Sequence, residues 1–576
     1  MVDVASFMKV TFFLLNIYNK ILLQTIDMKR CLNVVCFFAL VVAQIGCKKE
    51  NANPEKPAVF SLNSVKVNGV NNGFKYNNLG ASPTITLAFP AKVDPASVPA
   101  GVQWRSAAGS EVPYKVTYQN ENRELTLQPE SPLSGLTFYT LQLSTDLKSQ
   151  AGGNFQVPIT VELRTGLDST NKFPVISDDS LLTLVQRKTF SYFWEFGHPV
   201  SGLARERNTS GDVVTTGGSG FGIMAIPVAV SRNFISRNQG LERTQKIVSF
   251  LTTKAKRYHG AFPHWLNGAT GETVPFSAQD NGADLVETSF LMQGLLVARQ
   301  YFNRTDAAET ALRNDINALW QDVEWDWFRQ GQQNVLYWHW SPDQGWAINQ
   351  PITGWNESLI TYVLAAASPT HAVPKVVYDQ GWTRNGNFRN GKPFYGITLP
   401  LGPDLGGPLF LSHYSFLGLD PRKMKDGYAD YFNQNRSHAL INYNYCVENP
   451  KKYYGYSNRC WGLTASDIPG GYTASSPTND RGVIAPTAAL SSMPYTPEES
   501  MWAMKFFYYV LGDKLWGEYG FHDAFSLDQP WFANSYLAID QGPIIIMIEN
   551  HRSGLVWDLL MSAPEVQGGL RELGFK

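Results

Sequence analysis

The chain has no surplus of either charge, because its 48 lysines and arginines are balanced by 49 aspartates and glutamates, for a net charge of −1. A nucleic-acid-binding protein usually carries a basic surplus or stripe, so we do not expect this class. Charged residues make up 17% and hydrophobic residues 44% of the chain, which is typical of a folded protein rather than a disordered one. Its 576 residues suggest two or three domains.

Cysteine is scarce, with five residues in total and no spacing that resembles a zinc site. Cys446 and Cys460 are the only two outside the N-terminal segment. In an oxidising compartment they could form a disulfide, and two free buried thiols are the alternative. Nothing in the sequence calls for a metal ion or another cofactor, so we expect none.

The motifs of two common enzyme classes are also missing. The stretch GGSGFGIMA (217–225) lacks the G-x-G-x-x-G spacing, and no P-loop lysine follows it. No G-x-S-x-G nucleophile elbow occurs. We therefore expect neither a nucleotide site nor a serine hydrolase, and we interpret residues 217–225 as a tight loop at the mouth of a catalytic domain.

Residues 1–47 have the character of a signal segment. MKRCLNVVCFFALVVAQIGC (28–47) has a basic start, an apolar run and small residues before Cys47, and Met28 indicates a later translation start. Cys47 is a candidate lipidation site, so we expect an exported lipoprotein, periplasmic or anchored to the outer membrane. An uncleaved membrane anchor is the alternative, although the apolar run is short for a span. Residues 48–56 are polar and fit a tether.

Residues 57–576 show two different sequence patterns in succession, which predict two domains. Residues 57–165 contain about seven short alternating runs, such as PTITLAF (83–89), which predict a small all-β sandwich of immunoglobulin type. Residues 176–576 instead repeat apolar residues at helical spacing, with long loops between the helices. This pattern predicts a mainly α domain, either an α/α barrel with a cleft at one end or an irregular helical bundle.

Three acids precede an apolar run in QDNGADLVETSFLMQGLL (279–296), namely Asp280, Asp284 and Glu287. Asp284 and Glu287 fit a capping box, with an N-cap acid and a glutamate three residues later. Asp280 lies outside that box, beside an Asn-Gly turn that could direct its carboxylate toward a ligand. The three acids are therefore either ordinary helix-start residues or part of a site.

Glu357 opens another apolar run, in QPITGWNESLITYVL (350–364), after Trp355 and Asn356. It is either a favourable acid in a first helical turn or a general acid beside a sugar-stacking tryptophan. An acid catalyst needs a raised pKa, whereas a helix N-terminus lowers it, so burial or a neighbouring carboxylate would have to outweigh the helix. Asp540, before an apolar run at 537–557, is either an N-cap or a base that activates water.

Aromatic residues are abundant, at 13% of the chain, and several lie in polar loops such as LYWHWSPDQGW (336–346). Flat rings beside polar groups suit stacking on sugar faces. A large core that uses many aromatic residues explains the composition equally well.

Together these segments resemble the glucoamylase-like proteins of glycoside hydrolase family 144, the bacterial endo-β-1,2-glucanases. The resemblance covers roughly 176–576 and rests on YFWEFGHPVSGLARER (192–207), GGSGFGIMA (217–225), AQDNGADLVETSFLMQGLL (278–296), GWNESLITYVLAAASPTH (354–371), LFLSHYSFLGLDPR (409–422), YGYSNRCWGLTASD (454–467) and AIDQGPIIIMIEN (539–550). It implies an (α/α)6 barrel and an inverting attack on β-1,2-glucan or its oligosaccharides, either internal or from an end with release of sophorose. A non-catalytic surface glycan-binding lipoprotein, or a same-fold enzyme for another glucoside, is the alternative.

The resemblance also implies roles for individual residues. Asp280, Asp284 and Glu357 match acids that the family requires, with Glu357 as the general acid and Asp540 as the base acting through water. Asp467 and Glu287 are rivals for the base. The expected substrate-binding residues are Glu287, Trp355, Asn356, His413, Tyr414, Trp461, Asp467, Tyr472 and Arg205. The expected partners are a glucan substrate and a membrane reached through the lipid anchor, and the protein itself is expected to be a monomer.

Overall fold

The computed structural model describes residues 59–576. The predicted signal segment, the tether and the lipidation site at Cys47 lie outside these residues. Within residues 59–576, no helix combines the length and the apolar character that a membrane crossing requires.

The N-terminal part of the described chain is a sandwich of two four-stranded sheets, with strand orders β1-β3-β6-β5 and β2-β8-β7-β4. Every pairing is antiparallel except β2 with β8. The strands are β1 (Ser64–Val67), β2 (Lys75–Leu79), β3 (Ile85–Ala88), β4 (Val102–Ser106), β5 (Tyr114–Gln119), β6 (Glu124–Pro129), β7 (Phe138–Leu143) and β8 (Ile159–Thr165). In β6 the alternate residues Leu125 and Leu127 are fully buried, as the sequence pattern predicts.

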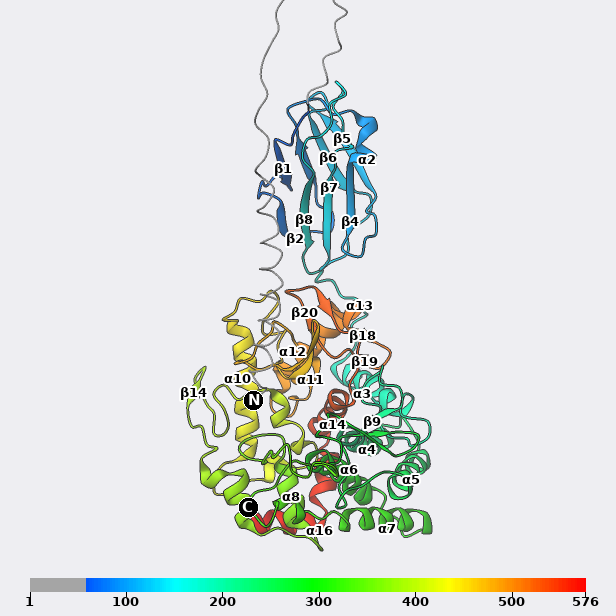
Figure 1. The fold of residues 1–576 in the computed structure, drawn as a ribbon, viewed down its shortest axis with the longest axis vertical. Helices are drawn as coiled ribbons and strands as arrows, with labels where there is room; N and C mark the ends of the chain where they lie inside the picture. Colours follow the sequence, from blue (N-terminus) through cyan, green and yellow to red (C-terminus); the bar gives the residue numbers. More distant parts are fainter. Residues whose placement is uncertain (1–58) are drawn as a thin grey trace, which may run out of the picture. The chain divides into compact units, whose positions relative to one another are not determined.

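The remaining residues are mainly helical (Figure 1), which confirms the predicted class of this part. The longer helices are α3 (Asp178–Trp194), α4 (Thr216–Ser231), α5 (Arg237–Thr253), α6 (Leu285–Tyr301), α7 (Ala307–Gln321), α8 (Leu359–Ala367), α10 (Tyr431–Glu448), α12 (Pro497–Lys505), α14 (Ala538–Arg552) and α16 (Pro564–Leu573). Helices α5, α7 and α16 bury one face each, whereas α4, α6 and α14 are buried almost throughout.

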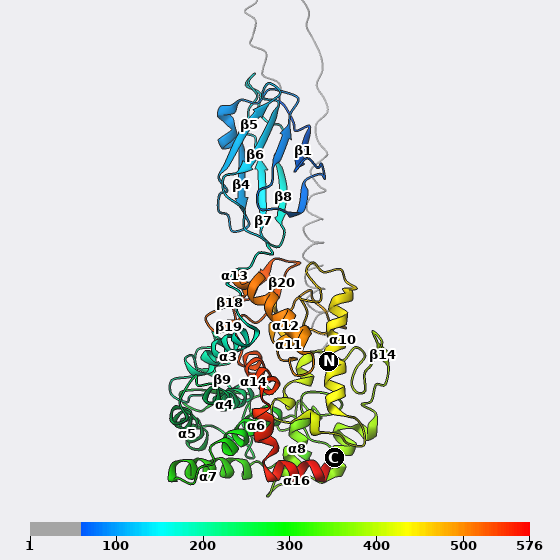
Figure 2. The same ribbon diagram turned by 180° about the vertical axis from the view of Figure 1, so that it is seen from behind.

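Helices α4 and α6 pack side by side in the middle of the helical part, and both views show α14 next to them (Figure 2). Glycines allow this approach. A Cβ on Gly220 would lie 2.1 Å from the Phe290 carbonyl oxygen, and one on Gly294 would lie 2.2 Å from the Gly220 carbonyl oxygen. The interpretation of residues 217–225 as a loop is therefore wrong, because these glycines belong to a buried helix and serve close backbone packing.

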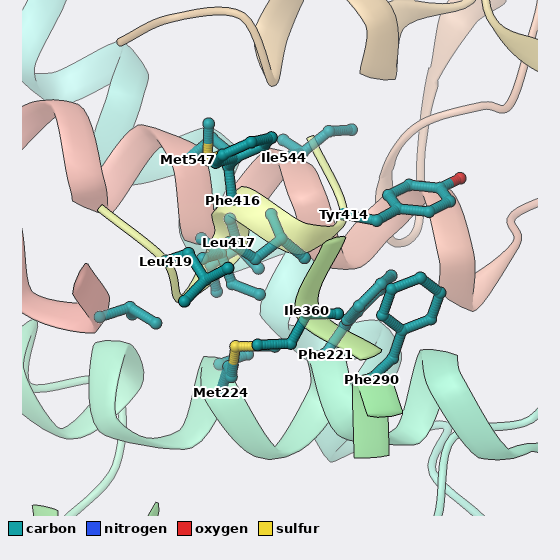
Figure 3. Close-up of a cluster of buried hydrophobic side chains, with 14 of the residues drawn as sticks. Phe221, Met224, Phe290, Ile360, Tyr414, Phe416, Leu417, Leu419, Ile544 and Met547 are labelled. Carbon is teal, nitrogen blue, oxygen red and sulfur yellow. The ribbon is translucent and has the colours of Figure 1, made fainter. Parts of the chain in front are cut away.

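The core between these helices is drawn in Figure 3. The rings of Phe221 and Phe290 lie 5.4 Å apart, and Tyr414 lies 5.4 Å and 5.7 Å from them. The hydroxyl of Tyr414 points away from the aliphatic side chains of the cluster, which include Ile360 and Ile544 (Figure 3). This rigid cluster ends at the cavity described below, since Phe290 and Tyr414 also line that cavity.

Among the described residues, Cys446 and Cys460 are free and only 0% and 1% exposed. The disulfide that the sequence suggested is not formed, and the alternative of two buried thiols holds. Burial raises the pKa of both thiols. The thiolate, which is the reactive form in disulfide exchange, is therefore disfavoured at both positions.

Candidate active site

A cavity of about 520 Å³ opens among the loops that lead into α4, α6, α8 and α14. Its volume lies within the range of about 300 to 1,000 Å³ that is usual for small-molecule sites. The polar side chains in its wall are Glu206, Arg207, Thr215, His264, Glu287, Glu357, Tyr414 and Tyr472. The apolar wall includes Trp265, Phe276, Phe290, Trp338, Phe410, Leu537 and Ile539. Aromatic faces beside carboxylates are the chemistry that a sugar ring and its hydroxyls require.

Asp284 begins α6 and also belongs to the site. Its Oδ1 accepts hydrogen bonds from the backbone N–H groups of Val286 and Glu287, at 3.0 and 2.9 Å, as an N-cap does. Its Oδ2 lies 2.9 Å from Nδ1 of His264, a cavity residue. The carboxylate is fully buried, so capping and ion pairing together satisfy it.

The predicted capping box is only half formed. Glu287 does not return to the backbone N–H of Asp284, which donates to the carbonyl of Phe262 instead. The Glu287 carboxylate reaches across to the first turn of α4 and accepts a hydrogen bond from the backbone N–H of Gly217 at 2.8 Å. A long-range contact thus displaces the local one, and it brings Glu287 into the cavity wall.

Asp280 lies on the other side of the same group of acids. The two-residue strand β12 (Ala283–Asp284) pairs with β13 (His339–Trp340) and brings His339 close to both aspartates. Nδ1 of His339 is 3.5 Å from Oδ2 of Asp280 and 3.8 Å from Oδ2 of Asp284. Oδ1 of Asp280 is buried without a hydrogen-bond partner in the protein, and Asp280 lies behind the residues that line the cavity.

The charged side chains in this group shift one another's pKa values. Burial would lower the pKa of His264, but the charges of Glu287, Asp284 and Asp280 outweigh it and raise that pKa to about 9. Burial would raise the pKa of Asp284, but the hydrogen bond from His264 and the charges of both histidines lower it. Burial raises the pKa of Glu287. Asp284 is therefore ionised at neutral pH and paired with an imidazolium.

Glu357 lies in the cavity wall, just before α8, whose N-cap is Ser358. The interpretation of Glu357 as a first-turn acid is therefore wrong by two positions. Burial raises the pKa of its carboxyl to about 7, and the charges of Glu287 and Asp284 add to the increase. Burial and the neighbouring carboxylates thus outweigh the hydrogen bond from the backbone N–H of Glu357, which lowers the pKa. Glu357 can therefore hold a proton near neutral pH and donate it.

A second group of acids surrounds the start of α14. Asp540 is the third residue of this helix and Leu537 is the N-cap, so the N-cap reading of Asp540 is wrong. Asp523, which the sequence reading missed, accepts a hydrogen bond from the backbone N–H of Asp467 at 2.7 Å. Arg207 Nη1 lies 3.3 Å from Oδ1 of Asp467.

Asp523 and Asp540 are two buried carboxyls that affect each other's ionisation. Oδ1 of Asp523 and Oδ2 of Asp540 are buried without a hydrogen-bond partner in the protein. Two carboxyls that share one buried site do not ionise together readily, because the like charges repel. Burial raises the pKa of Asp523 to about 7. Burial, followed by the charge of Asp523, raises the pKa of Asp540 well above its usual range.

Several residues expected to bind substrate lie away from the cavity. Trp355 is 6% exposed and packs against Trp382 and Phe416 in the core. Trp461 is fully buried and its indole N–H donates to the backbone. A tryptophan beside polar residues has the same local sequence in a core and in a subsite, so sequence could not separate these cases.

The other expected substrate-binding residues divide between the core and the site. His413 is buried against Ser492, and Arg205 donates to the carbonyls of Gly211 and Phe196. Asn356 accepts from the backbone N–H of Ser358 and so caps the turn before α8. Tyr414, Tyr472 and Glu287 line the cavity, and Asp467 is held beside it by Arg207.

Sequence alone did not point to five charged residues of the site: Glu206, Arg207, His264, His339 and Asp523. Arg207 lies two residues after the predicted Arg205, where an alternating stretch gives no reason to prefer either position. His264 reaches Asp284 from just before β10, and His339 reaches it from β13. No local signal marks them, because the pairing of β12 with β13 and the position of β10 (Trp265–Asn267) bring them together.

His264, Asp280 and Asp284 offer ligand atoms that all lie within 4.8 Å of one another. Imidazole and carboxylate groups at such distances could share a divalent cation. In the structure, the ion pair between His264 and Asp284 uses two of these groups. That no metal ion is required remains a prediction, and activity after dialysis against a chelator tests it.

Comparison with known proteins places the chain among a set of carbohydrate-active relatives. Residues 349–564 match the family model described as "Putative glucoamylase", and residues 63–165 match that of a bacterial Ig-like domain. An endo-β-1,2-glucanase from Chitinophaga pinensis, solved with sophorotriose and glucose, is 55% identical, with a TM-score of 0.68 over 70% of this chain and 99% of its own.

Two further similar proteins come from Parabacteroides distasonis. The structure of a β-1,2-glucanase is 39% identical, with a TM-score of 0.68 over 90% of this chain and 74% of its own. An exo β-1,2-glucooligosaccharide sophorohydrolase acting at the non-reducing end is 47% identical over 428 residues, or 70% of this chain. The match spans 59% of that curated relative's length.

Proposed function

Since the chain belongs to the glucoamylase-like proteins of glycoside hydrolase family 144, we propose that it is an inverting glycoside hydrolase that cleaves β-1,2-glucan or β-1,2-gluco-oligosaccharides. The observation that carries the proposal is Glu357, a cavity carboxyl whose burial raises its pKa to about 7. A general acid must hold its proton at the working pH and release it in the transition state.

In this mechanism Glu357 donates its proton to the glycosidic oxygen, the bond from that oxygen to C1 breaks, and water attacks C1 from the opposite face. A carboxylate takes the proton from that water. An inverting enzyme keeps its two carboxyls roughly 6.5–9.5 Å apart so that the water fits between them.

Asp540 is our candidate for the base. Asp540 can accept a proton only when it is ionised, and both burial and the charge of Asp523 oppose that ionisation. Asp540 is close enough to Tyr414 and Tyr472 in the cavity wall for its charge to raise the pKa of both phenols. Asp467 and Glu287 remain the rival bases. Asp280 and Asp284 would bond sugar hydroxyls, and Oδ1 of Asp280 has no hydrogen-bond partner in the protein.

The architecture fits this activity. We propose that residues 176–576 form an (α/α)6 barrel and residues 57–165 an Ig-like module. The division between the buried helices α4, α6 and α14 and the one-sided helices α5, α7 and α16 supports an inner and an outer ring. We also propose export as a monomeric lipoprotein attached at Cys47. Loss of palmitate labelling in Cys47→Ala would test the anchor.

Release of reducing ends from soluble β-1,2-glucan tests the function, with β-1,3-, β-1,4- and α-1,4-glucans alongside. We expect cleavage of the β-1,2 polymer alone and loss of activity in Glu357→Gln. The product ladder then separates internal cleavage from release of sophorose at an end. Activity in none of the four, with binding of β-1,2-glucan retained, would point to a glycan-binding protein instead.

A further inference from the structure

A second group of aromatic side chains lies outside the cavity. Trp327 belongs to the short helix η2 (Trp327–Arg329) and is 40% exposed. Its indole stacks on the His259 imidazole, with ring centres 3.9 Å apart and planes 14° apart. Trp340 lies 5.1 Å from His259 and Trp346 lies 6.4 Å from Trp327. We call these four residues the aromatic platform.

Contacts within the fold fix the position of His259 in the aromatic platform. His259 has the left-handed backbone conformation, with φ of 52°, which costs a residue other than glycine of order 1 kcal/mol. Its ring is fixed by Glu324, whose Oε2 lies 2.9 Å from Nδ1, and the Glu324 backbone N–H donates to the His259 carbonyl at 3.1 Å. The Trp327 indole is thus 40% exposed on a fixed support, and covering its apolar face would be favourable.

The platform continues directly from the cavity wall. Trp338 lines the cavity, and its carbonyl accepts a hydrogen bond from the backbone N–H of Leu285 at 2.9 Å, beside the β12–β13 pairing. In an extended segment, residues two apart face the same side. Trp338 in the cavity and Trp340 in the platform therefore share one side of the strand, while His339 lies near Asp280 and Asp284.

The segment that carries Asp280 also ties the platform to the site. Asn281 accepts a hydrogen bond from Ser341 Oγ at 2.6 Å and donates to Asp343 Oδ2 at 2.8 Å. Gly282 lets the strands approach, because a Cβ there would lie 2.3 Å from the Trp340 carbonyl oxygen. Hydrogen bonds and close backbone packing thus join the platform to the segment that carries Asp280, and polar groups lie beside the exposed ring of Trp327.

We propose that the aromatic platform binds a further stretch of the β-1,2-glucan chain, outside the cavity that cleaves it, with a pyranose face stacked on Trp327. The inference rests on the proposed function. A polymer longer than the cavity must leave it across the rim, and the platform offers sugar C–H faces an apolar ring with polar groups beside it for the hydroxyls. It is therefore a site for long substrates.

The test compares Trp327→Ala with Trp502→Ala as a matched control. Trp502 on α12 is also 40% exposed and has no ring contact with the platform. We expect Trp327→Ala to raise KM for long β-1,2-glucan about tenfold, which corresponds to about 1.4 kcal/mol. Its kcat, and its kcat/KM on sophorotriose, should stay unchanged, and Trp327→Phe should restore part of the affinity. Trp502→Ala should match the parent.

Binding of the polymer is measured in parallel by retardation in gels that contain β-1,2-glucan, in the Glu357→Gln background. Equal retardation with and without Trp327 would overturn the proposal, and so would an equal loss in the Trp502→Ala control. If the parent cleaves no β-1,2-linkage, the proposed function fails, and the gel experiment still decides whether the platform binds this glucan.

Discussion

At the scale of single residues, two acids that begin helices in the sequence have opposite proton affinities in the fold. Asp284 is bonded by two backbone N–H groups and His264, which together lower its pKa. Glu357 has no cationic partner among the described residues, and burial raises its pKa to about 7. Environment, not residue type, therefore assigns the acid role to Glu357.

The raised pKa of Glu357 predicts how activity depends on pH. The general acid must be protonated, so kcat/KM should fall about tenfold per unit as pH rises above about 7. Initial rates on sophorotriose between pH 5 and 9 measure this limb. In Glu357→Gln the rate should drop at least 10³-fold. A basic limb that stays flat to pH 9 would show that another group donates the proton.

The two roles of Asp284 can be separated by substitution. Asn is an equally good N-cap, so Asp284→Asn should keep the cap and lose only the charge paired with His264. Asp284→Ala should in addition lose about 1 to 2 kcal/mol of unfolding free energy. Activity and urea unfolding of both variants measure the difference. Full activity in Asp284→Asn would mean that Asp284 serves only as the N-cap of α6.

The sequence marked Asp280, Asp284, Glu287, Glu357 and Asp540 as candidate site acids, because they border apolar runs or match family motifs. It could not identify Asp523, because the fold alone brings this residue close to Asp540 and Asp467, which affect its ionisation. It also could not rank the pKa values, because burial and long-range charges set them. The substrate-binding role expected for aromatic residues was the hardest to predict, because Trp355 and Trp461 lie in the core.

At the scale of elements, the position of the site depends on how closely α4 and α6 pack. Glu287 at the start of α6 bonds to Gly217 at the start of α4, so a shift between these helices would move a cavity carboxylate. The helical character of residues 176–576 could be predicted because a helix with one apolar face repeats apolar residues with a period of 3.6. Helix α4 is buried on all sides and rich in glycine, so its sequence has neither periodicity nor ordinary helix composition.

This packing predicts opposite effects for two glycine substitutions. A Cβ at Gly294 would lie 2.2 Å from the Gly220 carbonyl oxygen, so Gly294→Ala should cost about 1 to 3 kcal/mol or more. Gly568 lies in α16, and the nearest atom to a Cβ there is 4.0 Å away. Gly568→Ala should therefore stabilise by about 0.5 to 1 kcal/mol. Thermal unfolding measures both, and equal effects would contradict the packing.

At the scale of the whole molecule, the buried acids link stability to pH. Burial raises the pKa of Glu357 and of Asp523 to about 7 in the folded state. The folded protein thus keeps protons that the unfolded chain releases above pH 4 to 5. This contribution is fully present below the unfolded pKa values and is lost as pH rises toward 7.

Unfolding temperature should therefore fall as pH rises from about 4.5 to 7, with the opposite contribution of Asp284 appearing only at lower pH. Asp523→Asn removes one of the groups responsible and should flatten this slope. Thermal unfolding of the parent and the variant across this range measures the effect. An unchanged slope in Asp523→Asn would mean that Asp523 releases its proton equally in both states.

The central claim is that Glu357 and a separate base act together in one displacement at a β-1,2 linkage. Proton NMR of soluble β-1,2-glucan in the first minutes of reaction tests it most directly. The account predicts that new reducing ends appear first as the α anomer and that Glu357→Gln produces none. New ends that appear first as the β anomer would mean retention through a covalent intermediate and would contradict the account.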